Sequence, residues 1–235
     1  MNARSAQPVS AKSARSASFR ATRATRDDTW RTKDRAAAAL WPDATPAQVR
    51  NNFHVTLHRI RKALGEGDWI LVHNDRYAIN PRYRVVCDDE QFEADARAIV
   101  AVVRAGRPVP ASAAGVVARY RGDYLEHEDV GEWHLARREG LLQLYCDLLL
   151  ACGTALAAAG RDGDSVDYFR RLIARDAANE VAGRGLITAY ARLGDRASAR
   201  RAFEQLVAAL RDELDVDPER ETLAAYRQAV GETGV

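Results

Sequence analysis

The fold is decided by the stretch Ala47-Gln48-Val49-Arg50-Asn51-Asn52-Phe53-His54-Val55-Thr56-Leu57-His58-Arg59-Ile60-Arg61-Lys62-Ala63-Leu64-Gly65. Its apolar residues recur at steps of four, four, three and four, which is the spacing of one face of an α-helix. They are Val49, Phe53, Leu57, Ile60 and Leu64. Gly65 is expected to end the helix. The pattern therefore predicts one amphipathic helix over residues 47–64.

The face opposite the apolar stripe consists of amides, imidazoles and cations, without an acidic residue. At about 100° per residue it is centred on Asn51, Val55, His58, Arg59 and Lys62, with Arg50, His54 and Arg61 along one side. Such a face suits the DNA major groove, because arginine pairs with guanine, asparagine with adenine, and a small apolar side chain contacts a thymine methyl. A thymine contact or a partner protein would explain the apolar Val55. An ordinary amphipathic helix with a solvated basic face is the alternative.

The charge is unevenly distributed along the 235 residues. Residues 1–87 hold 16 Lys and Arg against 7 Asp and Glu, a net charge of +9, whereas the remainder holds 19 against 26, a net charge of −7. A basic first part and an acidic second part indicate a nucleic-acid module joined to a module that does not bind nucleic acid.

The N-terminal 29 residues are rich in Ala, Ser, Arg and Thr and have almost nothing to bury, so they are expected to form a disordered basic tail. The chain has no apolar run near 18 residues, and no transmembrane span is expected. Cys87, Cys146 and Cys152 form no CxxC pair, which fits reduced thiols in a cytoplasmic protein.

The sequence on either side of the quoted helix predicts a winged helix-turn-helix. A short helix from Thr32 to Trp41 is ended by Pro42, and Thr45 with Pro46 begins the next helix after a short turn. After Gly65, apolar residues alternate with polar ones on both sides of Asn74-Asp75. They are Ile70 and Val72 before this turn and Tyr77 and Ile79 after it, a pattern that predicts a β-hairpin.

From Asp88 onward the sequence predicts helices only, over residues 91–105, 113–119 and 132–159 and then in pairs. Gly160 and Gly194 lie 34 residues apart. The same offset relates Phe169 to Phe203, Leu172 to Leu206, Ile173 to Val207 and Leu156 to Tyr190. A 34-residue period of paired helices is typical of tetratricopeptide repeats, and a generic helical bundle is the alternative.

No motif for catalysis or metal binding is found. His54 and His58 stand at i and i+4 but lack the following Glu and a third ligand. Residues 162–173 begin like a calcium loop but have Ile173 at the twelfth position. There is no Walker A loop and no Gly-x-Ser-x-Gly motif. The sequence predicts neither an enzyme nor a cofactor.

Several stretches together resemble the SARP-type bacterial transcriptional activators. These are Leu40–Ala44 with Arg50–Gly65, the turn Tyr120-Arg121-Gly122-Asp123-Tyr124-Leu125, the helix start Trp133-His134-Leu135-Ala136-Arg137-Arg138, and Asp212–Thr222 with its Glu-Leu-x-x-x-Pro-x-x-Glu-Thr pattern. The resemblance implies a mainly α-helical protein. It would have an OmpR-type winged helix over residues 30–86 and a bacterial transcriptional activation domain with tetratricopeptide-like helices over residues 88–235.

The resemblance also implies roles for individual residues. Asn51, Asn52, Val55, His58 and Arg59 would face bases, Thr56, Arg61 and Lys62 would contact the backbone, and His73 and Arg76 on the wing would reach the minor groove or phosphate. Arg50 completes the predicted DNA-binding set. The turn Asp43–Pro46 is where relatives contact RNA polymerase, so Asp43 is a candidate for that contact.

Two features differ from the family. Relatives have a small sheet and a first helix before the helix-turn-helix, whereas residues 1–29 show no such pattern, so the hydrophobic face is expected to be less well covered. Relatives also have Gly before the wing Tyr, where this chain has Arg76.

Two hypotheses follow. The first is a nucleoid-associated activator that binds double-stranded DNA and uses its helical domain for dimerisation or signal binding. The second is an interaction module with a degenerate winged helix, which could be a fragment of a larger regulator.

Overall fold

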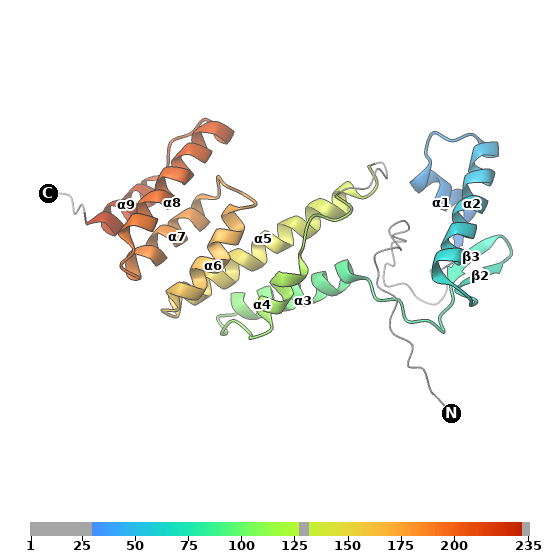
Figure 1. Ribbon diagram of the computed structural model, residues 1–235, viewed down its shortest axis with the longest axis horizontal. Helices are drawn as coiled ribbons and strands as arrows, with labels where there is room; N and C mark the ends of the chain where they lie inside the picture. Colours follow the sequence, from blue (N-terminus) through green and yellow to red (C-terminus); the bar gives the residue numbers. More distant parts are fainter. Residues whose placement is uncertain (1–29, 127–131, 232–235) are drawn as a thin grey trace, which may run out of the picture. The chain divides into compact units, whose positions relative to one another are not determined.

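A computed structural model describes residues 30–126 and 132–231 (Figure 1). The described residues form two compact units. The N-terminal unit comprises residues 30–85 and 132–133, and the C-terminal unit comprises residues 86–126 and 134–231. The expected disordered tail, residues 1–29, lies outside the described residues. The protein is mainly α-helical, as predicted.

The N-terminal unit combines two helices with a small antiparallel sheet. The elements are β1 (Arg31–Thr32), α1 (Lys33–Leu40), α2 (Pro46–Leu64), β2 (Ile70–His73) and β3 (Arg76–Ile79). The strand order is β1-β3-β2, with β3 in the centre. The two helices and the hairpin match the predicted elements, whereas β1 was not predicted because its two residues are strand only through their pairing with β3.

Local hydrogen bonds determine where α1 and α2 begin. The Thr32 hydroxyl accepts from the Arg35 amide at 3.3 Å, as expected of an N-cap. At α2 the Thr45 side chain accepts from the Gln48 amide, and Gln48 Oε1 accepts from the Thr45 amide at 2.8 Å. This reciprocal capping box follows the Thr-x-x-Gln spacing and fixes the first turn of α2. The helix ends at Gly65, whose φ of 76° favours glycine.

The hairpin turns at Asn74 and Asp75, with φ of 47° and 55°, and these values fit a type I′ turn. The strand pairing agrees with the sequence, but the simple alternation of buried and exposed residues does not. Val72 and Ile79 are 50% and 45% exposed, whereas Ala78 is buried. Only Tyr77 of the predicted inner face packs edge-on against Phe53, at a ring-centroid distance of 4.7 Å.

The apolar face of α2 is only partly covered. Phe53 is buried at 8% exposure, whereas Leu64 remains 39% exposed. Val49, Leu57 and Ile60 lie between these extremes. The N-terminal unit therefore depends heavily on one aromatic contact between α2 and the wing.

Replacing Phe53 with alanine should lower the free energy of unfolding of this unit by about 3–5 kcal/mol, because it leaves a cavity between α2 and β3. Urea unfolding followed by tryptophan fluorescence measures the change, since Trp41 and Trp69 both lie in this unit. Val72→Ala is the control, because Val72 is half-exposed. An unchanged midpoint for Phe53→Ala would show that the register of α2 is wrong.

The C-terminal unit is entirely helical in its described part. Its elements are α3 (Asp88–Arg104), α4 (Ala113–Arg119), α5 (Leu135–Ala158), α6 (Asp162–Ile173), α7 (Glu180–Arg192), α8 (Arg196–Ala209), the π-helix η2 (Leu210–Leu214) and α9 (Arg220–Val230). α4 has its predicted bounds. α3 begins three residues before its predicted start and α5 three residues after, and helix ends are the part of a helix that periodicity defines least well.

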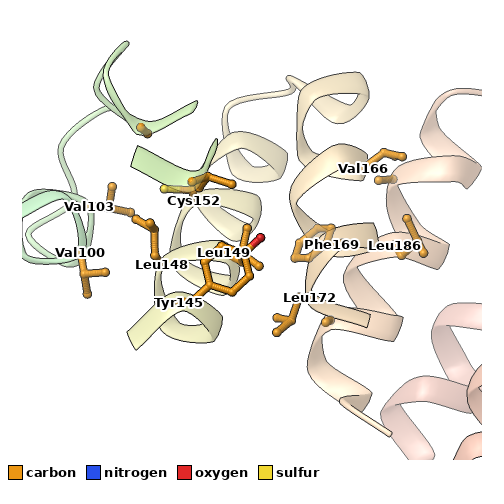
Figure 2. Close-up of a cluster of buried hydrophobic side chains, with 14 of the residues drawn as sticks. Val100, Val103, Tyr145, Leu148, Leu149, Cys152, Val166, Phe169, Leu172 and Leu186 are labelled. Atoms are coloured by element: carbon orange, nitrogen blue, oxygen red, sulfur yellow. The ribbon is translucent and has the colours of Figure 1, made fainter. Parts of the chain in front are cut away.

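The core of this unit is organised around α5 (Figure 2). Leu148, Leu149 and Cys152 are fully buried. They belong to a core that includes residues of α3, α6 and α7: Val100, Val103, Val166, Phe169, Leu172 and Leu186. Cys87, Cys146 and Cys152 are free thiols, and burial raises the pKa of Cys152 to about 11.

By length and apolar composition, α5 is a candidate membrane-spanning helix. Five of its buried residues nevertheless belong to the polypeptide core: Leu141, Tyr145, Leu148, Leu149 and Cys152. The composition of α5 is that of a helix covered by neighbouring helices, and such core helices pass the same test.

The 34-residue period is visible in equivalent positions. Gly160 and Gly194 have φ of 73° and 78° and follow the ends of α5 and α7, and Leu172 and Leu206 are both buried. Phe169 and Phe203, which share the 34-residue offset, are not equally buried, although equivalent positions of a repeat are expected to be. Phe169 is 2% exposed, whereas Phe203 is only half-buried and stacks on Tyr226 of α9 at 4.0 Å. The difference arises because α9, rather than a further 34-residue copy, contacts the last pair.

The ring of Phe169 is held between two glycines. A Cβ added at Gly153 of α5 would lie 2.8 Å from this ring, and one added at Gly185 of α7 would lie 2.5 Å from it. The ring therefore occupies space that only glycine leaves open on both neighbouring helices.

Gly185→Ala should destabilise the C-terminal unit by about 1–3 kcal/mol, because the new methyl group overpacks the Phe169 site. Gly140→Ala on the exposed side of α5 meets nothing within 4 Å, so it should be neutral or stabilising by up to about 1 kcal/mol. Thermal unfolding followed by circular dichroism compares the two variants. Equal changes in the midpoint temperature of unfolding for Gly185→Ala and Gly140→Ala would contradict the packing of Phe169 between the two helices.

The turn Tyr120–Leu125 is fixed by aromatic and charged contacts. Tyr120 stacks on Tyr145 at 4.2 Å, and its hydroxyl donates to Asp123 at 3.0 Å. Arg175 pairs with Asp123 at 3.2 Å and lies over the Tyr120 ring. Burial and the hydrogen bond to Asp123 raise the pKa of Tyr120 strongly. These contacts connect the turn to the start of the helical pairs.

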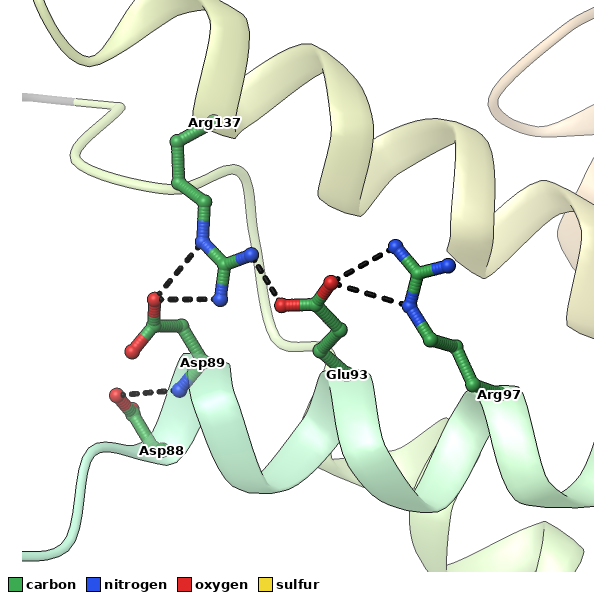
Figure 3. A network of polar contacts seen from close by, with 5 residues as sticks. All are labelled: Asp88, Asp89, Glu93, Arg97 and Arg137. Atoms are coloured by element: carbon green, nitrogen blue, oxygen red, sulfur yellow. Dashed lines mark hydrogen bonds and ion pairs between the residues drawn. The ribbon is translucent and has the colours of Figure 1, made fainter. Parts of the chain in front are cut away.

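A charged network joins the first turns of α3 and α5 (Figure 3). Arg137 donates to Asp89 at 2.9 and 3.0 Å and also pairs with Glu93, and Arg97 donates to Glu93 at 2.8 Å. Partial burial opposes ionisation of Glu93, but the hydrogen bonds from Arg137 and Arg97 outweigh it and lower the pKa of Glu93.

A carboxylate whose pKa is lowered in the folded state stabilises the fold above its unfolded pKa, and that contribution is lost as the pH falls. Wild-type stability should therefore decrease below about pH 4.5, the ordinary value for Glu93, and Glu93→Gln should flatten part of this decrease. Urea unfolding at a series of pH values measures it. Glu90→Gln, an exposed neighbour on α3, should follow the wild type. If the free energy of unfolding depended on pH in the same way for Glu93→Gln and wild type, the ion pairs of Glu93 would not contribute to stability.

Candidate nucleic-acid interface

The polar face of α2 is exposed along its length. Asn51, Val55, His58, Arg59 and Lys62, the predicted centre of this face, are all exposed, and Val55 is 41% exposed. From Asn51 to Lys62 the face extends about 16 Å at 1.5 Å per residue. The major groove of B-DNA is about 12 Å wide and admits an α-helix.

The flanking residues fall into two groups. Arg50, His54 and Arg61 on one side are exposed, as predicted. Asn52 and Thr56 on the other side are half-buried. Part of each of these two side chains is therefore covered by the N-terminal unit itself, and they border the exposed arc instead of lying at its centre.

The described residues provide no ion-pair partner for the cations of α2. In the described part of the chain, Arg50, Arg59, Arg61 and Lys62 form no ion pair with a carboxylate, and α2 itself contains no acidic residue. Unpaired surface cations attract phosphate groups and make binding dependent on salt.

The wing brings two further predicted residues together. His73 and Arg76 face each other across the β2–β3 ladder next to the turn, and both are exposed. Trp30 contacts His73 edge-on at 6.3 Å. Sequence reasoning missed this contact, because Trp30 lies far from His73 along the chain and reaches the wing only through the β1–β3 pairing.

The base of the wing is held by a cluster that the sequence analysis did not identify. Trp69 stacks on Tyr83 at 3.6 Å, and the Tyr83 hydroxyl donates to Asp68 at 2.9 Å. The side-chain amide of the buried Asn80 donates to the Asp68 carbonyl at 2.9 Å. The hydrogen bond to Asp68 raises the pKa of Tyr83. The sequence feature that could have indicated this cluster is the Asn80-Pro81 turn, after which the chain reverses direction and brings Tyr83 next to Trp69.

A shallow groove of about 310 Å³ separates α1 from the start of α2. Trp41, Pro42 and Val49 provide apolar walls, and Lys33 and Arg50 also line it. Asp43, the candidate polymerase contact, is exposed in the adjacent turn but does not line the groove. Within the described ranges, no group of three or more His, Cys, Asp or Glu side chains is arranged to hold a metal ion.

The helical part of the chain identifies the family. Residues 87–229 match the sequence profile of the bacterial transcriptional activator domain. The chain belongs to the bacterial transcriptional activator domain family. This family consists of transcription regulators and is not an enzyme family.

A solved structure shares the fold. EmbR from Mycobacterium tuberculosis, in complex with a low-affinity phosphopeptide, superposes with a TM-score of 0.62 at 22% sequence identity. The match covers 87% of this chain and 56% of EmbR, so the chain spans just over half the length of that protein. A comparison with curated protein sequences gives no match.

Proposed function

We propose that this member of the bacterial transcriptional activator domain family is a DNA-binding activator that reads the major groove with α2. The observation that carries the proposal is the exposed face of α2, which presents amide, imidazole and cationic groups without an intervening carboxylate. The N-terminal unit has the helix-turn-helix and hairpin order of a winged helix, which supports an OmpR-type module over residues 30–86.

Within this proposal the side chains divide between base recognition and backbone binding. Asn51, Asn52, Val55, His58 and Arg59 face bases. Thr56, Arg61 and Lys62 contact the backbone together with Arg50, while His73 and Arg76 extend the contact from the wing. Base contacts provide sequence specificity, and phosphate contacts provide affinity and orientation.

In this proposal the C-terminal unit, within residues 88–235, regulates the activator and does not bind DNA. Its paired helices with a 34-residue period support a tetratricopeptide-like domain that dimerises or binds a signal molecule or partner. The exposed turn at Asp43 would contact RNA polymerase, and the protein would act in the bacterial cytoplasm at the nucleoid.

Binding to duplex DNA measured as a function of salt tests this function. A family of duplexes, one of them selected by the protein from a random pool, is titrated at several salt concentrations. The proposal expects the logarithm of the association constant to fall linearly with the logarithm of salt concentration, and expects the selected duplex to bind more tightly than random duplexes.

Arg59→Ala and Lys62→Ala should affect different properties of DNA binding, the first its sequence specificity and the second its overall affinity. Arg59 can pair bidentately with guanine, and such a pair is worth roughly 1–3 kcal/mol of discrimination, so Arg59→Ala should reduce the preference for the selected duplex. Lys62→Ala should weaken binding to all duplexes equally and lower the salt slope by about 1. Fluorescence anisotropy measures both effects.

Arg107→Ala is the control, because Arg107 is exposed in the C-terminal unit and should leave both quantities unchanged. A folded protein that shows no salt-dependent binding to any duplex would favour the interaction module with a degenerate winged helix. The specific observation in favour of that second function is the incomplete cover on α2, where Leu64 is 39% exposed.

A further inference from the structure

An open hollow of about 480 Å³ lies between α8 and the end of α9, and its polar lining is made of arginine. Arg196, Arg200 and Arg201 come from the first two turns of α8, while Ala197 and Val230 provide small apolar walls. Among the described residues, no carboxylate lines the hollow. Its size falls within the range of about 300–1,000 Å³ that small-molecule sites occupy.

The three arginines are not neutralised within the described part of the protein. They form no ion pair there, whereas other arginines of the C-terminal unit are paired, such as Arg184 with Glu219 at 2.7 Å. Arg201 donates to the Ser198 hydroxyl at 2.8 Å. The nearby cap residue Asp195 has its pKa lowered by hydrogen bonds from Ser198 and by the charge of Arg201, but it is not close enough to Arg201 for an ion pair.

The preceding helical pair shows that the architecture does not require these cations. Thirty-four residues earlier, at the start of α6, the positions equivalent to Arg196 and Arg201 hold Asp162 and Asp167. Carboxylates suit the first turns of a helix, and cations there are disfavoured by the helix dipole. The arginines of α8 therefore need an explanation other than helix stability.

We propose that this hollow binds a small phosphate-bearing molecule. Arg196 and Arg200 are one helical turn apart, and each guanidinium can donate two parallel N–H groups to phosphate oxygens. A Cβ at Gly231 would lie 3.6 Å from the Arg196 guanidinium, so this group sits against the end of α9. Val230 offers an apolar surface to the remainder of the ligand. The proposal is independent of the DNA-binding role of α2.

Isothermal titration of the full chain with pyrophosphate tests the proposal. Arg196→Gln and Arg200→Gln should each weaken binding by roughly tenfold, the loss of one charge-assisted hydrogen-bonding group. The matched control is Arg170→Gln with Arg171→Gln, because these two exposed arginines on α6 also lack an ion pair among the described residues but do not line this hollow. The control should bind pyrophosphate as the wild type does.

Four outcomes would overturn the proposal. The first is no heat of binding. The second is an equal loss in the α6 control, which would show binding to net charge alone. The third is a loss of duplex DNA binding in the α8 variants with pyrophosphate binding unchanged, which would assign the arginines to nucleic acid. The fourth concerns Glu232, which follows Gly231 and lies outside the described residues. A tenfold gain in pyrophosphate affinity for Glu232→Gln would assign the arginines to the chain's own carboxylate.

Discussion

The contact between Phe53 and Tyr77 determines which side of α2 faces solvent. Phe53 is the buried residue of this helix, and its ring meets Tyr77 of the wing at 4.7 Å. Successive residues of a helix are about 100° apart, so a slip of one residue would move Arg59 toward the sheet and expose Ile60. The polar face of α2 is exposed because this aromatic pair fixes the rotation of the helix about its axis. The half-covered Val49, Leu57 and Ile60 contribute less to it.

The elements that the sequence predicted are those encoded locally. Hydrophobic spacing, Thr45 with Pro46 and Gly65 define α2, and Asn74-Asp75 defines the hairpin, because each signal lies within a few residues of its effect. The polar face of α2 follows from the same periodicity. The half-burial of Asn52 and Thr56 does not, since it depends on how the whole unit covers the helix. Likewise, β1 and the stacking of Trp69 on Tyr83 require partners distant in the sequence.

The contacts give a physical reason for the motifs shared with the family. Arg138, the last residue of the Trp-x-x-x-x-Arg segment, donates to the carbonyls of Tyr124, at 2.7 Å, and of Leu125. Leu125 has a φ of 51°, an unusual value for a non-glycine residue, and Arg138 holds the turn there. At the other end, Arg184 of α7 donates to Glu219 at 2.7 Å and to the buried Thr222 at 3.3 Å. In each case a residue of the motif forms a hydrogen bond with a segment distant in the sequence.

Several arginines of the C-terminal unit form ion pairs, whereas the cations of α2 form none among the described residues. In the C-terminal unit, guanidinium groups such as Arg137 and Arg175 join helices by pairing with carboxylates that are themselves partly buried. Pairing of this kind needs acidic partners, and the 26 Asp and Glu residues after residue 87 supply them. The cations of α2 have no such partners among the described residues, so they add no ion pair to the fold. A charge that forms no ion pair remains available to an external anion, and the placement of these charges along one exposed face supports the proposed binding of a polyanion with regularly spaced phosphates.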